Sequence, residues 1–287
     1  CSDKRTRNFR DSLQYLRGKG RAEKMKYLFF LKRALKNNTI YRFDYFLGCL
    51  NVCIQIFISC EIWKALYITN HVSGKVSLNV VLTSFIINLG LSNIYSIDDL
   101  TVQRKFCDGT IICELLKPIN YRIYLLADTV GNILFKLLFN LIPCSAIMII
   151  VYRNYFIFCI NSCSLCVFFL SIILGFMVLW EISSIVQMLC FWIVNVWSIS
   201  TIKDVFINVL AGTILPVWYL PEAIQNIIKY TPFAAIYITP LKIYLNQMGT
   251  KQQIEALLMQ LIWIIILVLF GNLLWHMGKK KLVVQGG

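Results

Sequence analysis

The chain has 287 residues, 58% of them hydrophobic, and a formal net charge of +14. Soluble domains are about 45–50% apolar, so this composition excludes an ordinary soluble domain. Thirteen of the 28 Lys and Arg residues lie within residues 1–42, directly before the first long apolar run. Such a cluster is typical of the flank of a membrane span and of segments attracted to anionic lipid, so no nucleic-acid partner is expected.

The N-terminal region is predicted to stay outside the hydrocarbon. Residues 1–24 are polar and basic and have no apolar core of the kind found in a cleavable signal peptide, so they are interpreted as an extension that precedes the transmembrane domain. Residues 22–40 mix Lys and Arg with Leu and Phe. Because long basic side chains can reach water from a helix at the interface, we expect an interfacial helix on the cytoplasmic surface.

Six apolar segments follow, and they predict an all-α integral membrane fold. A helix of about 20 residues crosses the roughly 30 Å of hydrocarbon in a bilayer. The expected spans are residues 43–66, 77–96, 129–152, 165–192, 205–219 and 253–276. They form one transmembrane domain, residues 25–287. The fifth span covers about 22 Å at 1.5 Å per residue, which is too short to finish the crossing alone.

The distribution of Lys and Arg predicts the orientation. The polar segment 97–128 lies on the same side as the N-terminus if the first two spans form a hairpin. With this topology, 21 Lys and Arg residues lie inside and five lie outside. Since basic residues concentrate on the cytoplasmic side, we expect a multi-pass protein of the bacterial cytoplasmic membrane with both termini in the cytoplasm.

Residues 212–240 hold four of the six prolines in the chain: Pro216, Pro221, Pro232 and Pro240. Proline removes a backbone donor and ends a helix, yet it suits the first helical turn. We expect Pro216 and Pro221 to end one helix, residues 222–230 to form a short one, and Pro232 to begin the next.

This proline-rich stretch is also largely apolar. Non-helical backbone is tolerated at membrane depth only where protein or a water-filled cavity satisfies it. We therefore expect a re-entrant hairpin that enters from the outer face, with Trp218 and Tyr219 at the interface and Phe233 and Ile236 pointing inward. The alternative is an ordinary outer loop with short helices.

The sequence contains none of the common catalytic motifs. It has no phosphate-binding GxxxxGK[ST], HExxH or GxSxG, which disfavours an enzyme. The clearest charged residues within the apolar segments are Lys136 and Glu181, and such residues are functional candidates by default. Their expected depths match, so we predict either an ion pair between spans three and four or, as the alternative, a direct role with substrate.

The eleven cysteines do not indicate a metal site. Cys163 and Cys166 have CxxC spacing, but a second such pair is missing and the chain contains two histidines. A zinc site is therefore not expected. A disulfide between Cys159 and either Cys163 or Cys166 is left open.

Several ordered motifs resemble those of the ABC-2 type exporter permeases. Tyr41 to Phe46 resembles the arginine-containing start of the first span, and the C-terminal Gln285, Gly286 and Gly287 resemble a tail common in one subgroup. The motif of the first inner loop is matched by Gly109, Leu115, Leu116, Lys117, Pro118 and Ile119. The motif before the last span is matched by Gly212, Pro216, Leu220, Pro221, Pro232 and Phe233.

The resemblance implies an exporter fold of type V with a cytoplasmic coupling helix between the second and third spans. Carried onto this sequence, the coupling helix covers about Thr110 to Leu116. Asp108 is placed to cap it and Pro118 to set the turn after it. The coupling set is Asp108, Gly109, Leu115, Leu116, Lys117 and Pro118, and the outer re-entrant gate is Pro216, Pro221, Pro232 and Phe233.

The resemblance also implies the partners. Two permease subunits, alike or different, would form the membrane unit, and two ABC ATPase subunits would dock inside. ATP and magnesium would bind to the ATPase, so this chain carries no cofactor. The cargo of this subgroup is expected to be amphipathic or hydrophobic, such as a drug or peptide. The alternatives are export of a polysaccharide or lipid-linked precursor and a membrane protein without transport activity.

Overall fold

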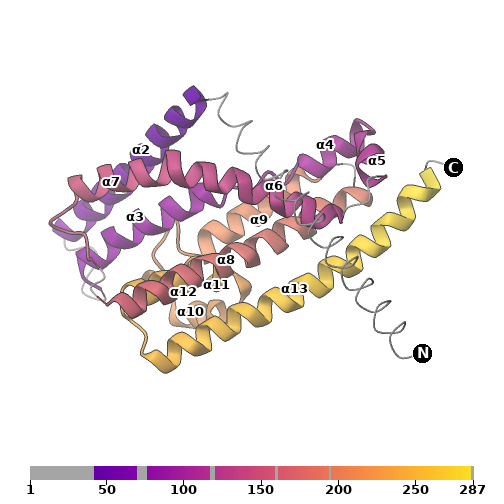
Figure 1. Cartoon of the computed structure of the whole chain (residues 1–287). Helices are drawn as coiled ribbons and strands as arrows, with labels where there is room; N and C mark the ends of the chain where they lie inside the picture. Colours follow the sequence, from indigo (N-terminus) through magenta and orange to yellow (C-terminus); the bar gives the residue numbers. More distant parts are fainter. Residues whose placement is uncertain (1–41, 70–75, 117–119, 159–160, 194, 286–287) are drawn as a thin grey trace, which may run out of the picture.

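The computed structural model describes residues 42–69, 76–116, 120–158, 161–193 and 195–285. Several sequence-based expectations lie outside these ranges: the extension 1–24, the interfacial helix 22–40, Lys117, Pro118, Cys159 and the last two glycines. The described residues form helices joined by short turns (Figure 1).

The first half of the described chain contains the helices α2 (Arg42–Ile68), α3 (Leu78–Ile94), α4 (Thr101–Cys107), α5 (Thr110–Leu115), α6 (Tyr121–Lys136) and α7 (Ile142–Val151). The second half contains α8 (Ser162–Met188), α9 (Trp197–Leu210), α10 (Glu222–Lys229), α11 (Pro232–Ile236), α12 (Ile238–Tyr244) and α13 (Thr250–Gln285). A π-helical turn, Leu137–Leu141, joins α6 to α7, so that these two helices form one continuous rod.

Four helical segments are long and apolar enough to cross a bilayer. They are Phe46–Ile68, Tyr121–Val151, Ser162–Phe191 and Thr250–Lys281. Helix α3 is apolar but has 17 residues, and α9 has 14. These helices identify an integral membrane protein, because stretches of this length and hydropathy match the thickness of the hydrocarbon.

Three of the expected spans have clearly different limits in the structure, and one of these, the sixth, is α13, which ends at Gln285, nine residues beyond its expected end. The third begins at Tyr121, eight residues before the expected start, because Asn120 caps the helix: its side-chain oxygen accepts a hydrogen bond from the backbone amide of Arg122 at 3.1 Å. The fifth, expected at residues 205–219, is instead α9, which begins at Trp197 and ends at Leu210.

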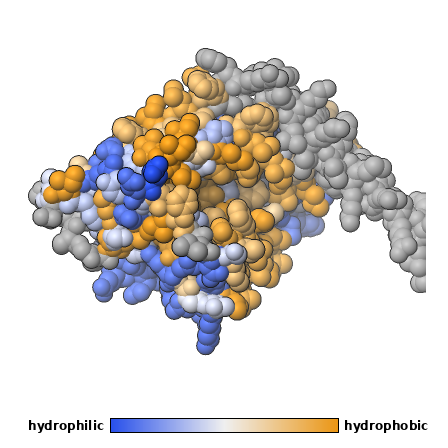
Figure 2. Space-filling view, turned by 60° about the vertical axis from the view of Figure 1, so that its left-hand side comes forward, coloured by the Kyte–Doolittle hydropathy of each residue, from blue (hydrophilic) through white to orange (hydrophobic). Residues whose placement is uncertain are grey.

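Helix α8 is the centre of the larger core, the largest of three hydrophobic clusters among the described residues, and it packs against α13, α11 and α12. The second core lies among α2, α3 and α7, and a small third cluster lies around α10 to α12. Many large apolar side chains of α2, α7, α8 and α13 point outward and are exposed. Figure 2 shows hydrophobic residues over much of one face, with hydrophilic residues gathered toward one side. A surface of this kind fits a lipid solvent.

The prolines of residues 212–240 divide this stretch into short pieces, as expected. Helix α9 ends at Leu210, before Pro216, and the chain turns at Gly212, whose φ of +79° favours glycine. Pro221 occupies the position before α10, and Pro232 begins α11. Pro216 and Pro221 therefore stand before short helical segments; the expectation that they end the preceding helix is wrong.

The broken backbone between α11 and α12 is buried and satisfied by a side chain of α13. Gln260 is fully buried and donates a hydrogen bond to the carbonyl oxygen of Ala235 at 2.7 Å and another to Ser171 of α8. A side chain at Gly175 would meet the carbonyl oxygen of Ile236 at 2.8 Å, so glycine is required for this close approach. The backbone polar groups here are thus buried between α8 and α13 and hydrogen-bonded by Gln260, as buried backbone in an apolar environment requires.

Candidate functional site

Helices α4 and α5 form a compact unit at one end of the molecule, the same end that holds the C-terminal part of α13 (Figure 1). We call them the α4–α5 unit. The turn between them is made by Gly109 with a φ of +68°, a conformation that other residues rarely adopt. Asp108 lies at the C-terminal end of α4, where its amide bonds to the carbonyl of Arg104. The expectation that Asp108 caps α5 is therefore wrong, because Gly109 stands between them.

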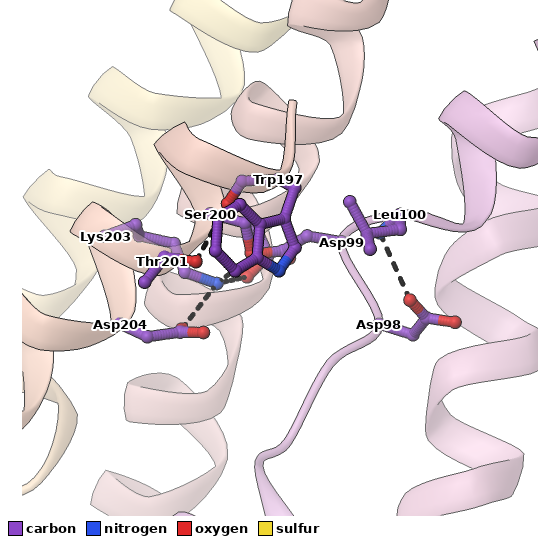
Figure 3. A network of polar contacts seen from close by, with 9 residues as sticks. Asp98, Asp99, Leu100, Trp197, Ser200, Thr201, Lys203 and Asp204 are labelled. Atoms are coloured by element: carbon purple, nitrogen blue, oxygen red, sulfur yellow. Dashed lines mark hydrogen bonds and ion pairs between the residues drawn. The ribbon is translucent and has the colours of Figure 1, made fainter. Parts of the chain in front are cut away.

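A buried acidic group fastens the start of the α4–α5 unit to two other helices. Asp99, in the turn after α3, accepts a hydrogen bond from Ser200 of α9 at 2.7 Å and forms an ion pair with Lys203 of the same helix (Figure 3). Lys203 also donates to the hydroxyl of Ser183 on α8 at 3.0 Å. Both side chains of the ion pair are almost fully buried. We call these four residues the Asp99 cluster.

Further polar contacts hold the α4–α5 unit in place. Gln103 of α4 accepts a hydrogen bond from the amide of Val196, just before α9, at 3.0 Å. Lys105 of α4 pairs with Glu114 of α5 at 2.9 Å, which joins the two short helices. The unit therefore moves with its neighbours rather than as a free loop.

An aromatic contact fastens the other side of the unit. Phe106 of α4 meets the ring of Phe191 edge-on at 5.9 Å, and Phe191 meets Trp275 of α13 at the same distance. Trp275 also stacks on Tyr121 at the start of α6, at 5.5 Å. A side chain at Gly278 would overlap Phe191, so α13 approaches this cluster closely. Through these rings, and through the Gln103 and Asp99 contacts, α4 is linked to α6, α8, α9 and α13, so a displacement of α4 would shift these helices.

The outward surface of α5 and of the turn after it carries mixed side chains. Thr110 and Cys113 of α5 are exposed, and Leu116, the residue after α5, is 80% exposed. An apolar side chain with this exposure, beside a unit that is otherwise fastened at several points, is a candidate contact for a partner. The side chain of Leu115 lies outside the described part of the structure.

The intramembrane ion pair differs from the expected one. Glu181 of α8 pairs with Arg122 of α6, whose guanidinium also contacts Asn272 of α13. Lys136 instead donates to the backbone oxygen of Ser96 at 3.1 Å. The predicted Lys136–Glu181 pair is wrong, because α6 begins at Tyr121 and brings Arg122 to the depth of Glu181.

The sequence profile described as ABC-2 family transporter protein matches residues 74–286, about three quarters of the chain. The chain belongs to this family. None of the curated proteins compared with it matches. Permeases of the ABC-2 type are membrane components of transporters and are not themselves catalytic, and they normally work with ABC ATPase partners.

Of the residues expected to form the gate of this permease, only some occupy a common place in the structure. Phe233 packs against the larger core, whereas Pro216 and Pro221 precede the turns around Val217 and α10. Ile236 is fully buried, and the hydroxyl of Tyr219 contacts that of Tyr67 on α2. The stretch is thus bonded to α2 on one side and packed on α8 on the other.

The described residues of the permease contain no group of three or more His, Cys, Asp or Glu side chains placed to hold a metal ion. Cys163 and Cys166 are free and exposed. Sequence reasoning missed the Asp99 cluster and Arg122. Asn120 just before an amphipathic segment was the available signal for Arg122, since asparagine is a strong N-cap residue.

Proposed function

We propose that this permease is the transmembrane subunit of an ATP-driven exporter, and that the α4–α5 unit receives the motion of an ABC ATPase. The carrying observation is the combination of the exposed face of α5 with the buried contacts of Asp99 and Phe106. A force applied at Leu116 reaches α8 and α9 through Lys203, and α13 through Phe191 and Trp275. Rigid packed elements of this kind transmit displacement because well-packed interiors are hard to compress.

The charge distribution supports a cytoplasmic location for this end. Among the described residues, it holds Arg104, Lys105, Lys203 and the three lysines 279–281. Positive charge near span ends favours the cytoplasmic side. In this arrangement α3 and α9 are the two shorter spans of a six-span subunit, and the stretch from Gly212 to Tyr244 is the outer re-entrant hairpin.

The expected complex contains two permease subunits and two ATPases, with ATP and magnesium bound to the ATPases. The proposed cargo is amphipathic or hydrophobic, as for a drug or peptide. Support comes from the wide apolar surface of the described helices.

Co-purification tests the proposal. The tagged permease, isolated in mild detergent from its native membranes, should retain an ABC ATPase recognisable by its P-loop. Inside-out vesicles holding the complex should accumulate an amphipathic dye when ATP is added. Leu116→Asp should release the ATPase, because it places a charge in the proposed contact, while the permease still inserts and runs as a folded particle.

Ile224→Asp is the matched control. Ile224 is a partly exposed apolar residue on α10, in the proposed outer hairpin, so this change should leave the ATPase bound. A permease that purifies alone and is indifferent to ATP would contradict the proposal. So would a Leu116→Asp complex with unchanged composition and ATP-dependent uptake.

A further inference from the structure

A cavity of 540 Å³ lies between α10, α11, α12 and the start of α13, away from the α4–α5 unit. This volume falls in the range of about 300–1,000 Å³ that is usual for small-molecule sites. The residues that line it include lysines and side-chain amides as well as apolar groups. The cavity therefore suits a molecule that has both kinds of surface.

Two lysines give the polar part a positive charge. Lys229 of α10 and Lys242 of α12 both line the cavity, and within the described ranges neither has a carboxylate within ion-pair distance. Burial lowers the pKa of Lys242, and the like charge of Lys229 lowers it further, so the two lysines that line this cavity repel each other. Glu255 also lines the cavity, but its side chain is exposed. An anion that entered between the lysines would relieve this repulsion.

Side-chain amides add hydrogen-bond donors to the same region. Asn226 and Gln247 line the cavity, and neither amide is engaged in a hydrogen bond with another described residue. Charge-assisted bonds from lysine, supported by amide donors, are the ordinary means of holding a carboxylate or phosphate in a pocket.

The apolar part of the cavity continues along α13. Ala256 and Met259 line the cavity on the helix face that also holds Gln252 and Glu255, at the three- and four-residue spacing of one helix side. The next residues on this face, Ile262 and Ile266, are about half exposed. They form an apolar path that leads from the cavity toward the middle of α13.

We propose that this cavity binds the anionic head group of an amphipathic molecule whose apolar part lies along α13. An anionic membrane phospholipid and a transported single-chain amphiphile share this chemistry. Interpreting the cavity as a cargo site rests on the proposed export function. Binding of the amphiphile itself requires neither ATP nor an ATPase.

Photolabelling of the purified permease in phosphatidylcholine nanodiscs tests the proposal. The probe is a palmitate analogue that carries a diazirine, and its methyl ester is the neutral control. Peptide mass spectrometry should place the label of the acid at the start of α13 and on α10 to α12. The ester should label the lipid-facing helices without this concentration. Equal patterns for acid and ester overturn the proposal, and this comparison needs no variant.

Charge variants give the second measurement. Lys229→Gln combined with Lys242→Gln should reduce labelling of the cavity peptides at least about tenfold, the effect of losing charge-assisted hydrogen bonds. Lys251→Gln, an exposed lysine at the start of α13 that does not line the cavity, is the matched control and should change little. Glu255→Gln should raise labelling. Unchanged labelling in the double variant, with its elution profile intact, overturns the proposal.

Competition separates the two sources. Displacement of the probe by phosphatidylglycerol at a few mole per cent identifies a lipid head-group site, whereas displacement by oleate alone identifies a site for free amphiphiles. Failure of both anions to compete better than phosphatidylcholine overturns the proposal. Because ATPase retention is measured separately with Leu116→Asp, failure here leaves the transport proposal standing, and the reverse also holds.

Discussion

Arg122 of α6 donates a hydrogen bond to the carboxylate of Glu181 on α8 over 2.5 Å, and both side chains are about 8% exposed. The guanidinium lies against α13, where a side chain at Gly271 would meet it at 2.7 Å. Trp180 stands 5.8 Å from it. The pair therefore joins three helices at a depth where an unpaired charge is expensive.

Removal of one partner of this pair should be costly. Arg122→Gln or Glu181→Gln alone should lower the free energy of unfolding by about 3–5 kcal/mol, because a buried charge is left without its partner. Arg122→Gln combined with Glu181→Gln should cost less than the sum of the two single losses, because neither charge then remains. Thermal unfolding in detergent, followed by fluorescence, measures the three variants. Strictly additive losses would contradict the pair, and Arg153→Gln, at an exposed position, is the control.

Replacing Asp99 and replacing its neighbour Asp98 should change the free energy of unfolding by very different amounts. Asp99→Asn removes the buried carboxylate beside Lys203 and leaves the exposed Asp204, at 3.1 Å, as its remaining partner, so the free energy of unfolding should fall by about 1–3 kcal/mol. Asp98 pairs with Arg104 at the surface, and Asp98→Asn should cost no more than about 1 kcal/mol. The two adjacent changes remove the same charge, so their difference compares the buried contacts of Asp99 with the surface contacts of Asp98.

In a complex with its ATPase, Asp99→Asn has a second expected effect. ATP hydrolysis should continue while ATP-dependent dye uptake falls, because the α4–α5 unit is no longer fastened to α9. A parallel loss of ATPase binding would instead indicate that the Asp99 cluster only maintains the fold. Measurement of both activities on the same preparation distinguishes these results.

Gln260 should be sensitive to an apolar replacement of similar size. Gln260→Met keeps the volume but leaves the carbonyl of Ala235 and the groups of Ser171 without a donor, at a cost of about 1–3 kcal/mol. Gln252→Met, on the exposed part of α13, loses only the hydrogen bond that its side-chain oxygen accepts from the amide of Gly249 at 3.2 Å, and should cost less than about 1 kcal/mol. Equal unfolding temperatures for the two variants would show that the break between α11 and α12 does not depend on this side chain.

The sequence predicts the elements whose limits depend on local signals. Apolar length marks α2, α3 and α8 to within a few residues of their ends, and it marks the start of α13 but not its end, which lies nine residues beyond the expected one. Proline position marks the starts of α10 and α11. The partner of Glu181 could not be predicted in the same way. It depends on Asn120 moving a helix start by two turns, and apolar length alone does not reveal a cap.

The hydrogen bonds of Gln260 could not be predicted from the sequence either. It joins a carbonyl 25 residues away to a serine 89 residues away, and both distances become short only after α8, α11 and α13 have packed. The Asp99 cluster likewise joins residues about 100 positions apart. Spacing along the chain carries no signal for such contacts, since they are created by tertiary packing.

The proposed re-entrant arrangement of residues 212–244 predicts a contrast in accessibility between two alanines. Ala223 on α10 is exposed, whereas Ala235 on α11 is 3% exposed and packed beneath α8 and α13. Each is replaced by cysteine in a background without other cysteines, and the change from alanine adds little volume. A membrane-impermeant maleimide applied to whole cells should label Ala223→Cys within minutes and Ala235→Cys far more slowly.

The rate at position 235 should rise toward that at position 223 after denaturation in detergent, which confirms that the cysteine is reactive but covered. Equal fast labelling in intact cells would mean that residues 212–244 form a plain exposed loop. Labelling of Ala223→Cys only after the cytoplasmic face is opened would reverse the proposed orientation, and the α4–α5 unit would then lie outside, where no ATPase could reach Leu116.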